Sequence, residues 1–153
     1  MAEQSSRAIV EQFIRALEAK DFDAQGLLVA DDYVDKMPQS GERIRGRANA
    51  RAIVDHYPGG VGTIDSNSRR VVGADDRYVM TPTFSILRIE GSGDTFTYSG
   101  TVQYGNGETW HIIAIVEVRN GKVAKSTTYY AAPFDAPEWR APYVERMEAP
   151  HGQ

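Results

Sequence analysis

The C-terminal half of the chain is a series of runs in which polar and apolar residues alternate, separated by short turn sequences. Two of the turns, at residues 106–107 and 120–121, are Asn-Gly pairs. Asn-Gly between alternating runs is the strongest short-range signal for a two-residue β-hairpin, because the turn needs a positive φ at both positions. Further turn sequences occur at residues 74–76 and 91–94. From Ser68 onward, the pattern predicts an antiparallel meander of about four long strands.

The N-terminal third predicts helices instead. Apolar side chains recur at helical spacing within residues 6–20, which predicts an amphipathic helix that a serine caps. Asp21 is placed to cap a second, shorter helix, and a third is expected over residues 47–57, between a glycine and a Pro-Gly-Gly sequence. Residues 33–37 (YVDKM) alternate in polarity before a proline and predict a short edge strand. The expected fold class is α+β, with helices from the N-terminal third only.

The length of 153 residues suits one domain. We expect residues 1–131 to form the α+β domain, followed by an extension at 132–153 that is rich in proline and aromatic residues. Prolines restrict the freedom of such a segment, so it has the composition of a rigid flap. Phe134 and Trp139 could pack over the domain or onto a partner.

Composition and charge exclude several classes of function. The chain has no cysteine, so disulfides, thiolate metal sites and cysteine nucleophiles are ruled out. The net charge of −4 argues against a nucleic-acid partner, and no run is long and apolar enough for a membrane span or a signal peptide. We therefore expect a cytoplasmic location. The three histidines lack the spacing of metal ligands, so neither a metal nor another cofactor is expected.

The densest basic patch lies on residues 43–51, which contain four arginines. Two interpretations are open. The arginines could line a solvated loop and helix face, or they could form a phosphate site.

Several longer segments resemble a known group of proteins. FIRALEAKDFDAQGLLVADDYV is similar to its opening pair of helices, GERIRGRANARAIVDHY to its glycine-then-helix step, and HIIAIVEVRNGKVAKSTTYY to its final hairpin. The group is the nuclear transport factor two-like superfamily, which includes ketosteroid isomerases and SnoaL-like polyketide cyclases. The resemblance covers residues 5–131. It implies a curved sheet wrapped around three helices as a cone, an apolar cavity on the concave face, and a homodimer formed through the outer sheet face.

Matching the final hairpin to the isomerase pattern assigns the two faces of the last strands. The residues expected on the inner face are Trp110, Ile112, Ala114, Val116, Val118, Ser126, Thr128 and Tyr130. The residues expected on the outer face are His111, Ile113, Ile115, Glu117 and Tyr129. A register error of one residue would exchange the two sets.

The catalytic groups of the isomerases are missing. Such an isomerase needs a carboxylate base and two acidic hydrogen-bond donors for the enolate oxygen. The position that matches the tyrosine donor is Phe13, the base position is Met37, and the second acid falls at Ala114 or Ile115. Steroid isomerisation by that mechanism is therefore not expected.

The catalytic groups of two other branches are missing as well. The cyclases use an acid on the last strand, often with a histidine two residues before it, and these positions match Thr128 and Ser126. Neither hydroxyl is suited to acid–base work near neutral pH. The Asp–Arg–Asp relay of the epoxide hydrolases cannot be placed on this sequence.

Asp35 is the available substitute for the missing base. It shares strand parity with Tyr33 and Met37, and in an apolar cone its pKa would rise into a useful range. The alternative is a carboxylate that faces solvent on an edge strand. The candidate catalytic residues are thus Asp35 and Tyr130. The predicted substrate-binding residues are Phe13, Tyr33, Met37, Tyr98, Trp110, Ile112, Ala114, Ser126 and Thr128.

Two functions follow from these assignments. The first is a small-molecule enzyme of the polyketide-cyclase or isomerase-like group, acting on an apolar substrate that is cyclic or bears a carbonyl. The second is a non-catalytic module that binds a hydrophobic ligand or assembles as a dimer, which the loss of the usual acids favours.

Overall fold

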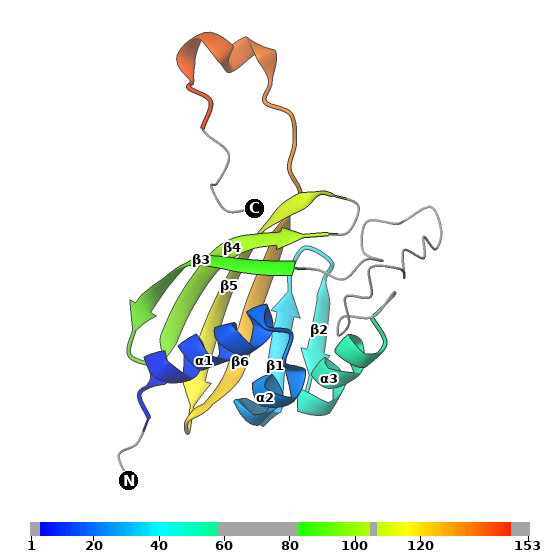
Figure 1. The fold of residues 1–153 in the computed structure, drawn as a ribbon, viewed down its shortest axis with the longest axis vertical. Coiled ribbons are helices and arrows are strands. Elements are labelled where there is room, and N and C mark those ends of the chain that lie inside the picture. Colours follow the sequence, from blue (N-terminus) through cyan, green and yellow to red (C-terminus); the bar gives the residue numbers. More distant parts are fainter. Residues whose placement is uncertain (1–3, 58–82, 105–106, 148–153) are drawn as a thin grey trace.

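The computed structural model describes residues 4–57, 83–104 and 107–147. Three helices lie on one face of a curved, six-stranded sheet (Figure 1). The strand order across the sheet is β2-β1-β6-β5-β4-β3. The turn expected at residues 74–76 lies outside the described part of the chain. The helices and strands are α1 (Ser6–Glu18), α2 (Phe22–Leu27), β1 (Val29–Met37), β2 (Glu42–Arg45), α3 (Arg47–Asp55), β3 (Thr83–Ser92), β4 (Thr95–Gln103), β5 (Thr109–Arg119) and β6 (Lys122–Ala131).

The first two helices begin where their capping residues predict. The hydroxyl of Ser5 accepts a hydrogen bond of 3.2 Å from the Ala8 N–H, and the carboxylate of Asp21 accepts one of 3.0 Å from the Ala24 N–H. Each cap pairs an N–H that would otherwise lack a partner in the first turn. The apolar stripe of α1 is buried against the sheet, with Phe13 at its centre.

The predicted meander is present as β3 to β6, with antiparallel pairing throughout. At the β5–β6 turn, Asn120 has a φ of 51° and Gly121 a φ of 70°. This is the left-handed geometry that a tight hairpin requires and that Asn-Gly accepts at little cost. The fold class predicted from the sequence is therefore confirmed.

The strand predicted around Asp35 differs from the expectation in two respects. β1 begins at Val29 and is not at the edge, because β2 pairs with it and takes the edge position. The other side of β1 pairs with β6 in parallel, so the sheet is mixed. Sequence patterns did not predict β2, since it is four residues long and three of them are charged.

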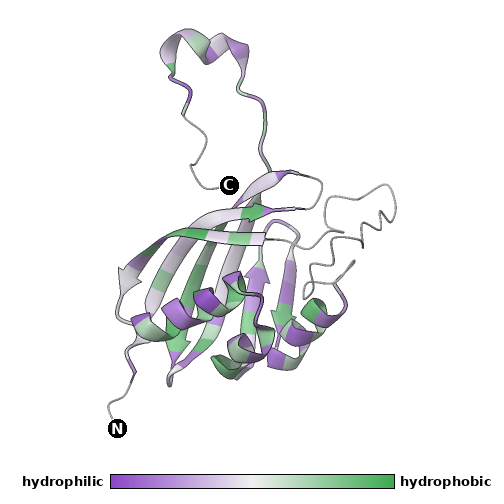
Figure 2. Cartoon of the chain, in the orientation of Figure 1, coloured by the Kyte–Doolittle hydropathy of each residue, from purple (hydrophilic) through white to green (hydrophobic). Residues whose placement is uncertain are grey.

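The predicted faces of the last two strands are confirmed. Along β5, every second residue from Trp110 to Val118 is buried and the residues between them are exposed. On β6, Ser126 and Thr128 are buried while Tyr129 is exposed. The alternation of apolar and polar bands along these strands can be followed in Figure 2.

The outer face of the sheet carries an apolar strip, which we define as Ile113, Ile115 and Tyr129. Their exposed fractions are 47%, 41% and 40%, and Ile113 lies directly opposite Tyr129 on the neighbouring strand. Dimerisation through this face stays a prediction. None of the helices in the described ranges is both long and apolar enough to cross a membrane.

The close approach of β3 to β4 gives a prediction about stability. A Cβ at Gly100 would lie 2.1 Å from the Ser85 carbonyl oxygen and 2.8 Å from the Ile86 Cα, so Gly100→Ala must displace backbone. We expect this change to lower the free energy of unfolding by about 1–3 kcal/mol in urea denaturation. Gly26→Ala is the matched control, because a Cβ there meets nothing within 4 Å. It should be neutral or stabilise α2 by about 0.5–1 kcal/mol. Equal destabilisation by both changes would contradict this account of the packing.

Candidate functional site

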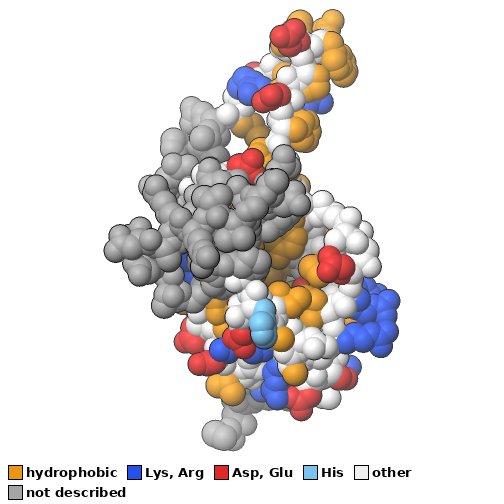
Figure 3. All heavy atoms as spheres, turned by 90° about the vertical axis from the view of Figure 1, so that its right-hand side faces the viewer, with side chains coloured by type: hydrophobic (Ala, Val, Ile, Leu, Met, Phe, Trp, Pro, Cys, Tyr) orange, Lys and Arg blue, Asp and Glu red, His pale blue; other side chains and the backbone are white. Residues whose placement is uncertain are grey.

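A cavity of about 1570 Å³ lies between the concave face of the sheet and the helices. Its walls come from all three helices and from β1, β2, β3, β4, β5 and β6. Apolar side chains gather near the middle of the molecule on the face shown in Figure 3, with charged side chains around them. A concave, largely apolar space with a few polar groups is the usual form of a small-molecule site.

The polar groups of the cavity are held by two hydrogen bonds between β1 and β6. The Tyr33 hydroxyl donates to the Ser126 hydroxyl at 2.9 Å, and the Thr128 hydroxyl donates to the Asp35 carboxylate Oδ1 at 3.0 Å. The parallel register sets Asp35 beside Ser126, which brings both pairs to one side of the cavity. Local sequence does not reveal this arrangement, because the partners are 93 residues apart.

Asp35 is half-buried, and this burial raises the pKa of its carboxyl above the usual range. The hydrogen bond from Thr128 acts in the opposite direction, since it stabilises the carboxylate. Burial also raises the pKa of Tyr33, Tyr98 and Tyr130, and the negative charge of Asp35 adds to each increase. The three phenols therefore remain protonated and can act as hydrogen-bond donors near neutral pH.

Two of these phenols have no hydrogen-bond acceptor within the described residues. They belong to Tyr98, which is 5% exposed, and to Tyr130 on the neighbouring part of the wall. Buried hydroxyls are normally paired, so an unpaired one on a cavity wall marks a place for a ligand atom. The backbone of Tyr130 is fixed, because its N–H donates to the side-chain oxygen of Gln39.

Two aromatic side chains, Tyr104 and Trp110, pack against each other on another part of the wall. The indole N–H of Trp110 donates to the Glu108 carboxylate at 3.0 Å, and the ring of Tyr104 packs edge-on against the indole with centroids 5.4 Å apart. Edge-to-face packing of this kind is the preferred aromatic geometry. Trp110 is thereby held in one orientation on the wall of the cavity.

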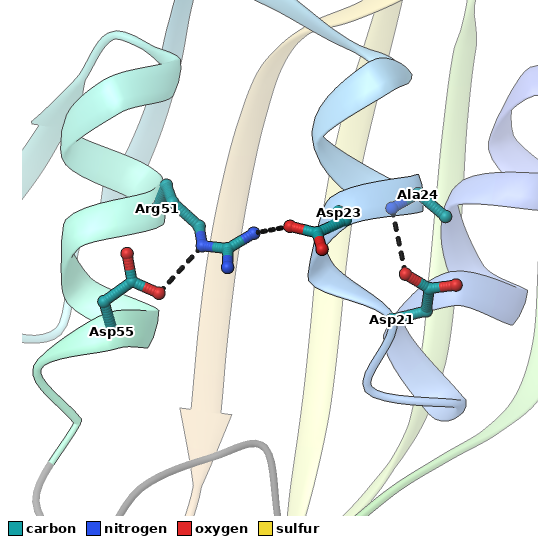
Figure 4. Close-up of polar contacts among 5 residues, drawn as sticks. All are labelled: Asp21, Asp23, Ala24, Arg51 and Asp55. Atoms are coloured by element: carbon teal, nitrogen blue, oxygen red, sulfur yellow. Dashed lines mark hydrogen bonds and ion pairs between the residues drawn. The ribbon is translucent and has the colours of Figure 1, made fainter.

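Arg51 connects two helices that form part of the cavity wall. Its guanidinium lies 2.5 Å from the Asp23 carboxylate on α2 and 2.8 Å from the Asp55 carboxylate on its own helix, α3 (Figure 4). The same view shows Asp21 capping α2 at Ala24. Arg47, also on α3, pairs with the Asp31 carboxylate on β1. Since carboxylates already neutralise these two arginines, the arrangement favours the solvated helix face over the phosphate site.

The structure places the sequence-predicted site residues as follows. Asp35 and Tyr130 both line the cavity, together with Phe13, Tyr33, Met37, Tyr98, Trp110, Ile112, Ser126 and Thr128. Ala114 does not line it. It is fully buried on the same face, but it lies between the larger side chains of Tyr98 and Thr128 in the ladder, and its methyl group is too short to reach the cavity.

Apart from Phe13, sequence reasoning missed the part of the wall that comes from the helices, and it also missed the contributions of β2 and β3. The helix over residues 47–57 was predicted from its flanking glycine and Pro-Gly-Gly sequence, which do not show that it covers the cavity. Within the described residues, no group of three or more acidic or histidine side chains could hold a metal ion. The lining residues that were not predicted include Leu17, Phe22, Val29, Ile44, Ile53, Val54, His56, Tyr57, Phe84 and Tyr104.

The raised pKa of Asp35 gives a prediction about stability and pH. A carboxyl whose pKa is higher in the folded state binds its proton more tightly there, so the wild-type protein loses stability as the pH rises through that pKa. The Asp35→Asn variant has no carboxyl at this position, so it does not show this pH-dependent loss of stability. We expect its free energy of unfolding, relative to wild type, to increase from about pH 4 to pH 8 in urea denaturation. Asp32→Asn is the control, because Asp32 is exposed and pairs with Arg119. Parallel pH profiles for wild type and Asp35→Asn would contradict the buried state of this carboxyl.

The fold and the cavity agree with comparisons to known proteins. The sequence matches the SnoaL-like domain family over residues 10–126. An NTF2-like protein of unknown function from Burkholderia xenovorans is 32% identical, with a TM-score of 0.68 over 94% of this chain and 95% of that one. No curated protein matches the sequence.

More distant structures show the same fold. A putative ketosteroid isomerase from Kribbella flavida is 22% identical, with a TM-score of 0.74 over 95% of this chain and 91% of that one. An LEH-like epoxide hydrolase from M. tuberculosis is 21% identical, with a TM-score of 0.57 over 82% of this chain and 81% of that one. The match to the Burkholderia protein covers 94% of this chain. The residues after Ala131 make up more of the chain than the part left uncovered, so the match includes some of them. The chain belongs to the SnoaL-like domain family of the NTF2-like superfamily.

Proposed function

We propose that this protein is an enzyme that performs acid–base chemistry on an apolar small molecule that is cyclic or bears a carbonyl. The observation that carries the proposal is the Asp35 carboxylate, half-buried on the wall of an apolar cavity and fixed by Thr128 at 3.0 Å. Similarity to a putative ketosteroid isomerase and to an LEH-like epoxide hydrolase agrees with a small-molecule substrate. At these identities it supports the fold rather than the reaction.

Asp35 takes the part of the base. Thr128 donates to Oδ1, which leaves Oδ2 to accept a proton from the carbon next to a substrate carbonyl. The electron pair of the broken C–H bond moves into the carbonyl system and forms an enolate. The carboxyl then returns the proton to the same carbon, or to another carbon of the conjugated system, so no oxidant or cofactor is consumed.

Tyr130 takes the part of the donor to the enolate oxygen. Its hydroxyl has no acceptor among the described residues, and its raised pKa keeps it protonated. A fixed donor in an apolar site stabilises developing negative charge far better than water does, because it needs no reorganisation. The Tyr98 hydroxyl can donate to the same substrate oxygen or to a second one. The hydroxyls of Tyr33 and Ser126 are already hydrogen-bonded to each other.

Proton abstraction can be tested without knowledge of the natural substrate. We suggest 2-tetralone as the probe, because it is bicyclic, apolar and has acidic protons beside its carbonyl. In D₂O, wild-type protein should accelerate the replacement of these protons by deuterium, as followed by ¹H NMR. Asp35→Asn should lower the accelerated rate by a factor of about 100 or more, and Tyr130→Phe by a factor of about 100. Asp32→Asn should exchange like wild type.

A binding measurement separates the enzyme from the second function. The chain has two tryptophans, so Trp139→Phe leaves Trp110 as the single reporter on the cavity wall. In this background, quenching of Trp110 fluorescence measures the affinity for 2-tetralone with and without Asp35→Asn. Similar affinities together with loss of exchange support catalysis by Asp35. Binding with no exchange in the wild type would contradict proton abstraction from this ketone. It would favour a module that binds hydrophobic ligands, which the apolar residues at the family's usual acid–base positions, Phe13 and Met37, also favour.

A further inference from the structure

The segment after β6, residues 132–147, forms what we call the C-terminal arm. It contains a short 3₁₀-helix, η2 (Glu138–Tyr143), and projects beyond the end of the sheet (Figure 1). Its large apolar side chains face solvent, as the top of Figure 3 shows. Their exposed fractions are 81% for Phe134, 76% for Trp139, 83% for Tyr143 and 94% for Met147.

The arm contains a 3₁₀-helix, but contacts with its own domain do not account for the stability of that helix. η2 makes no extensive contact with any of the described helices or strands, and its Arg140 N–H donates to the nearby carbonyl of Pro137. An isolated 3₁₀-helix of this length gains too little from its internal hydrogen bonds to be stable in water. Exposed apolar side chains grouped in this way mark an interaction surface. Prolines at positions 133, 137 and 142 stiffen the arm, which lowers the entropy lost when it binds.

A second unpartnered surface lies on the same chain, beside the point where the arm begins. The apolar strip of Ile113, Ile115 and Tyr129 is on the outer face of β5 and β6, and Tyr129 is two residues before the last residue of β6. The arm projects beyond the end of the sheet and does not fold back over its own domain (Figure 1). The strip of another molecule is within reach of an arm that leaves the domain in this direction.

We propose that the C-terminal arm is exchanged between two copies of this chain and packs on the outer sheet face of the partner. In a dimer with a two-fold axis, the arm of each copy covers the strip of the other copy. The assembly is then closed, and neither the arms nor the strips remain exposed. The strip alone offers three apolar side chains, whereas a stable interface buries roughly 800 Å² on each partner. The arm supplies the large aromatic anchors that such an interface needs.

Sedimentation velocity over a range of protein concentrations tests the assembly. Wild-type protein should form a dimer. Phe134→Ala combined with Trp139→Ala should weaken the dimer by roughly 30-fold or more, and so should Ile115→Lys. All three side chains are exposed in the single chain, so the variants should fold and keep the thermal unfolding temperature of the monomer. Leu27→Ala is the matched control, because Leu27 is 70% exposed but lies on α2, away from the outer face.

Cross-linking tests where the arm lies. Because the chain has no cysteine, Trp139→Cys and Ile115→Cys each introduce a single thiol. When the two variants are mixed, one of them isotopically labelled, a short bis-maleimide linker should join an arm to the sheet of the other chain. Three results would overturn the proposal: a monomeric wild type at about 100 μM, a dimer that the arm substitutions leave unchanged, or a mixture of the two cysteine variants in which no cross-link joins Trp139→Cys of one chain to Ile115→Cys of the other.

Discussion

The parallel pairing of β1 with β6 is the contact on which the cavity and its polar groups depend. It joins the N-terminal third of the chain to the last strand and sets Asp35 beside Ser126. A register shift between Val29 and Val34 adjusts β1 to its partner before Asp35 is reached. Because side chains alternate between faces, a slip of one residue would turn Asp35 out of the cavity. The Tyr33–Ser126 and Asp35–Thr128 hydrogen bonds hold the register in place.

The degree of burial of Asp35 fits an acid–base role. A fully buried, unpaired carboxylate would cost several kcal/mol and remain protonated, whereas an exposed one would keep its ordinary pKa and be a weak base. Asp35 is half-buried and accepts one hydrogen bond, so its pKa is raised while the ionised form is still supported. The neighbouring phenols of Tyr98 and Tyr130 stay neutral, because burial raises their pKa. Acceptor and donor functions are thus divided between different side chains on one wall.

Local sequence patterns were sufficient to predict the meander, the turns at residues 91–94 and 120–121, and the inner and outer faces of β5 and β6; Asn106 of the turn expected at 106–107 lies outside the described residues. These features depend on alternation and on Asn-Gly turns, which act over short distances. The place of β1 in the sheet could not be predicted, because its pairing partner β6 is distant in the sequence and leaves no local signal. β2 was missed since its charged residues resemble a loop.

In the candidate site, too, the features that depend on local sequence were predicted and those that depend on distant contacts were not. Strand parity and the family resemblance together indicated the polar part of the wall on β1 and β6, including Asp35 and Tyr130. Ala114 was assigned to the inner face by the family pattern and strand parity, and neither says how far a side chain reaches. The contribution of α3 depends on how helices pack against the sheet, and the Arg51 contact between α2 and α3 joins residues distant in sequence.

The central claim is that Asp35 is a carboxylate with a raised pKa that can exchange protons with a ligand in the cavity. The most direct measurement is a pH titration of the Asp35 side-chain carboxyl carbon by ¹³C NMR, assigned by comparison with Asp35→Asn. The account predicts a midpoint clearly above the ordinary value of about 4. It also predicts a further increase in Thr128→Val, because that change removes the hydrogen bond that stabilises the carboxylate. A midpoint at or below the ordinary value, unmoved by Thr128→Val, would contradict the account.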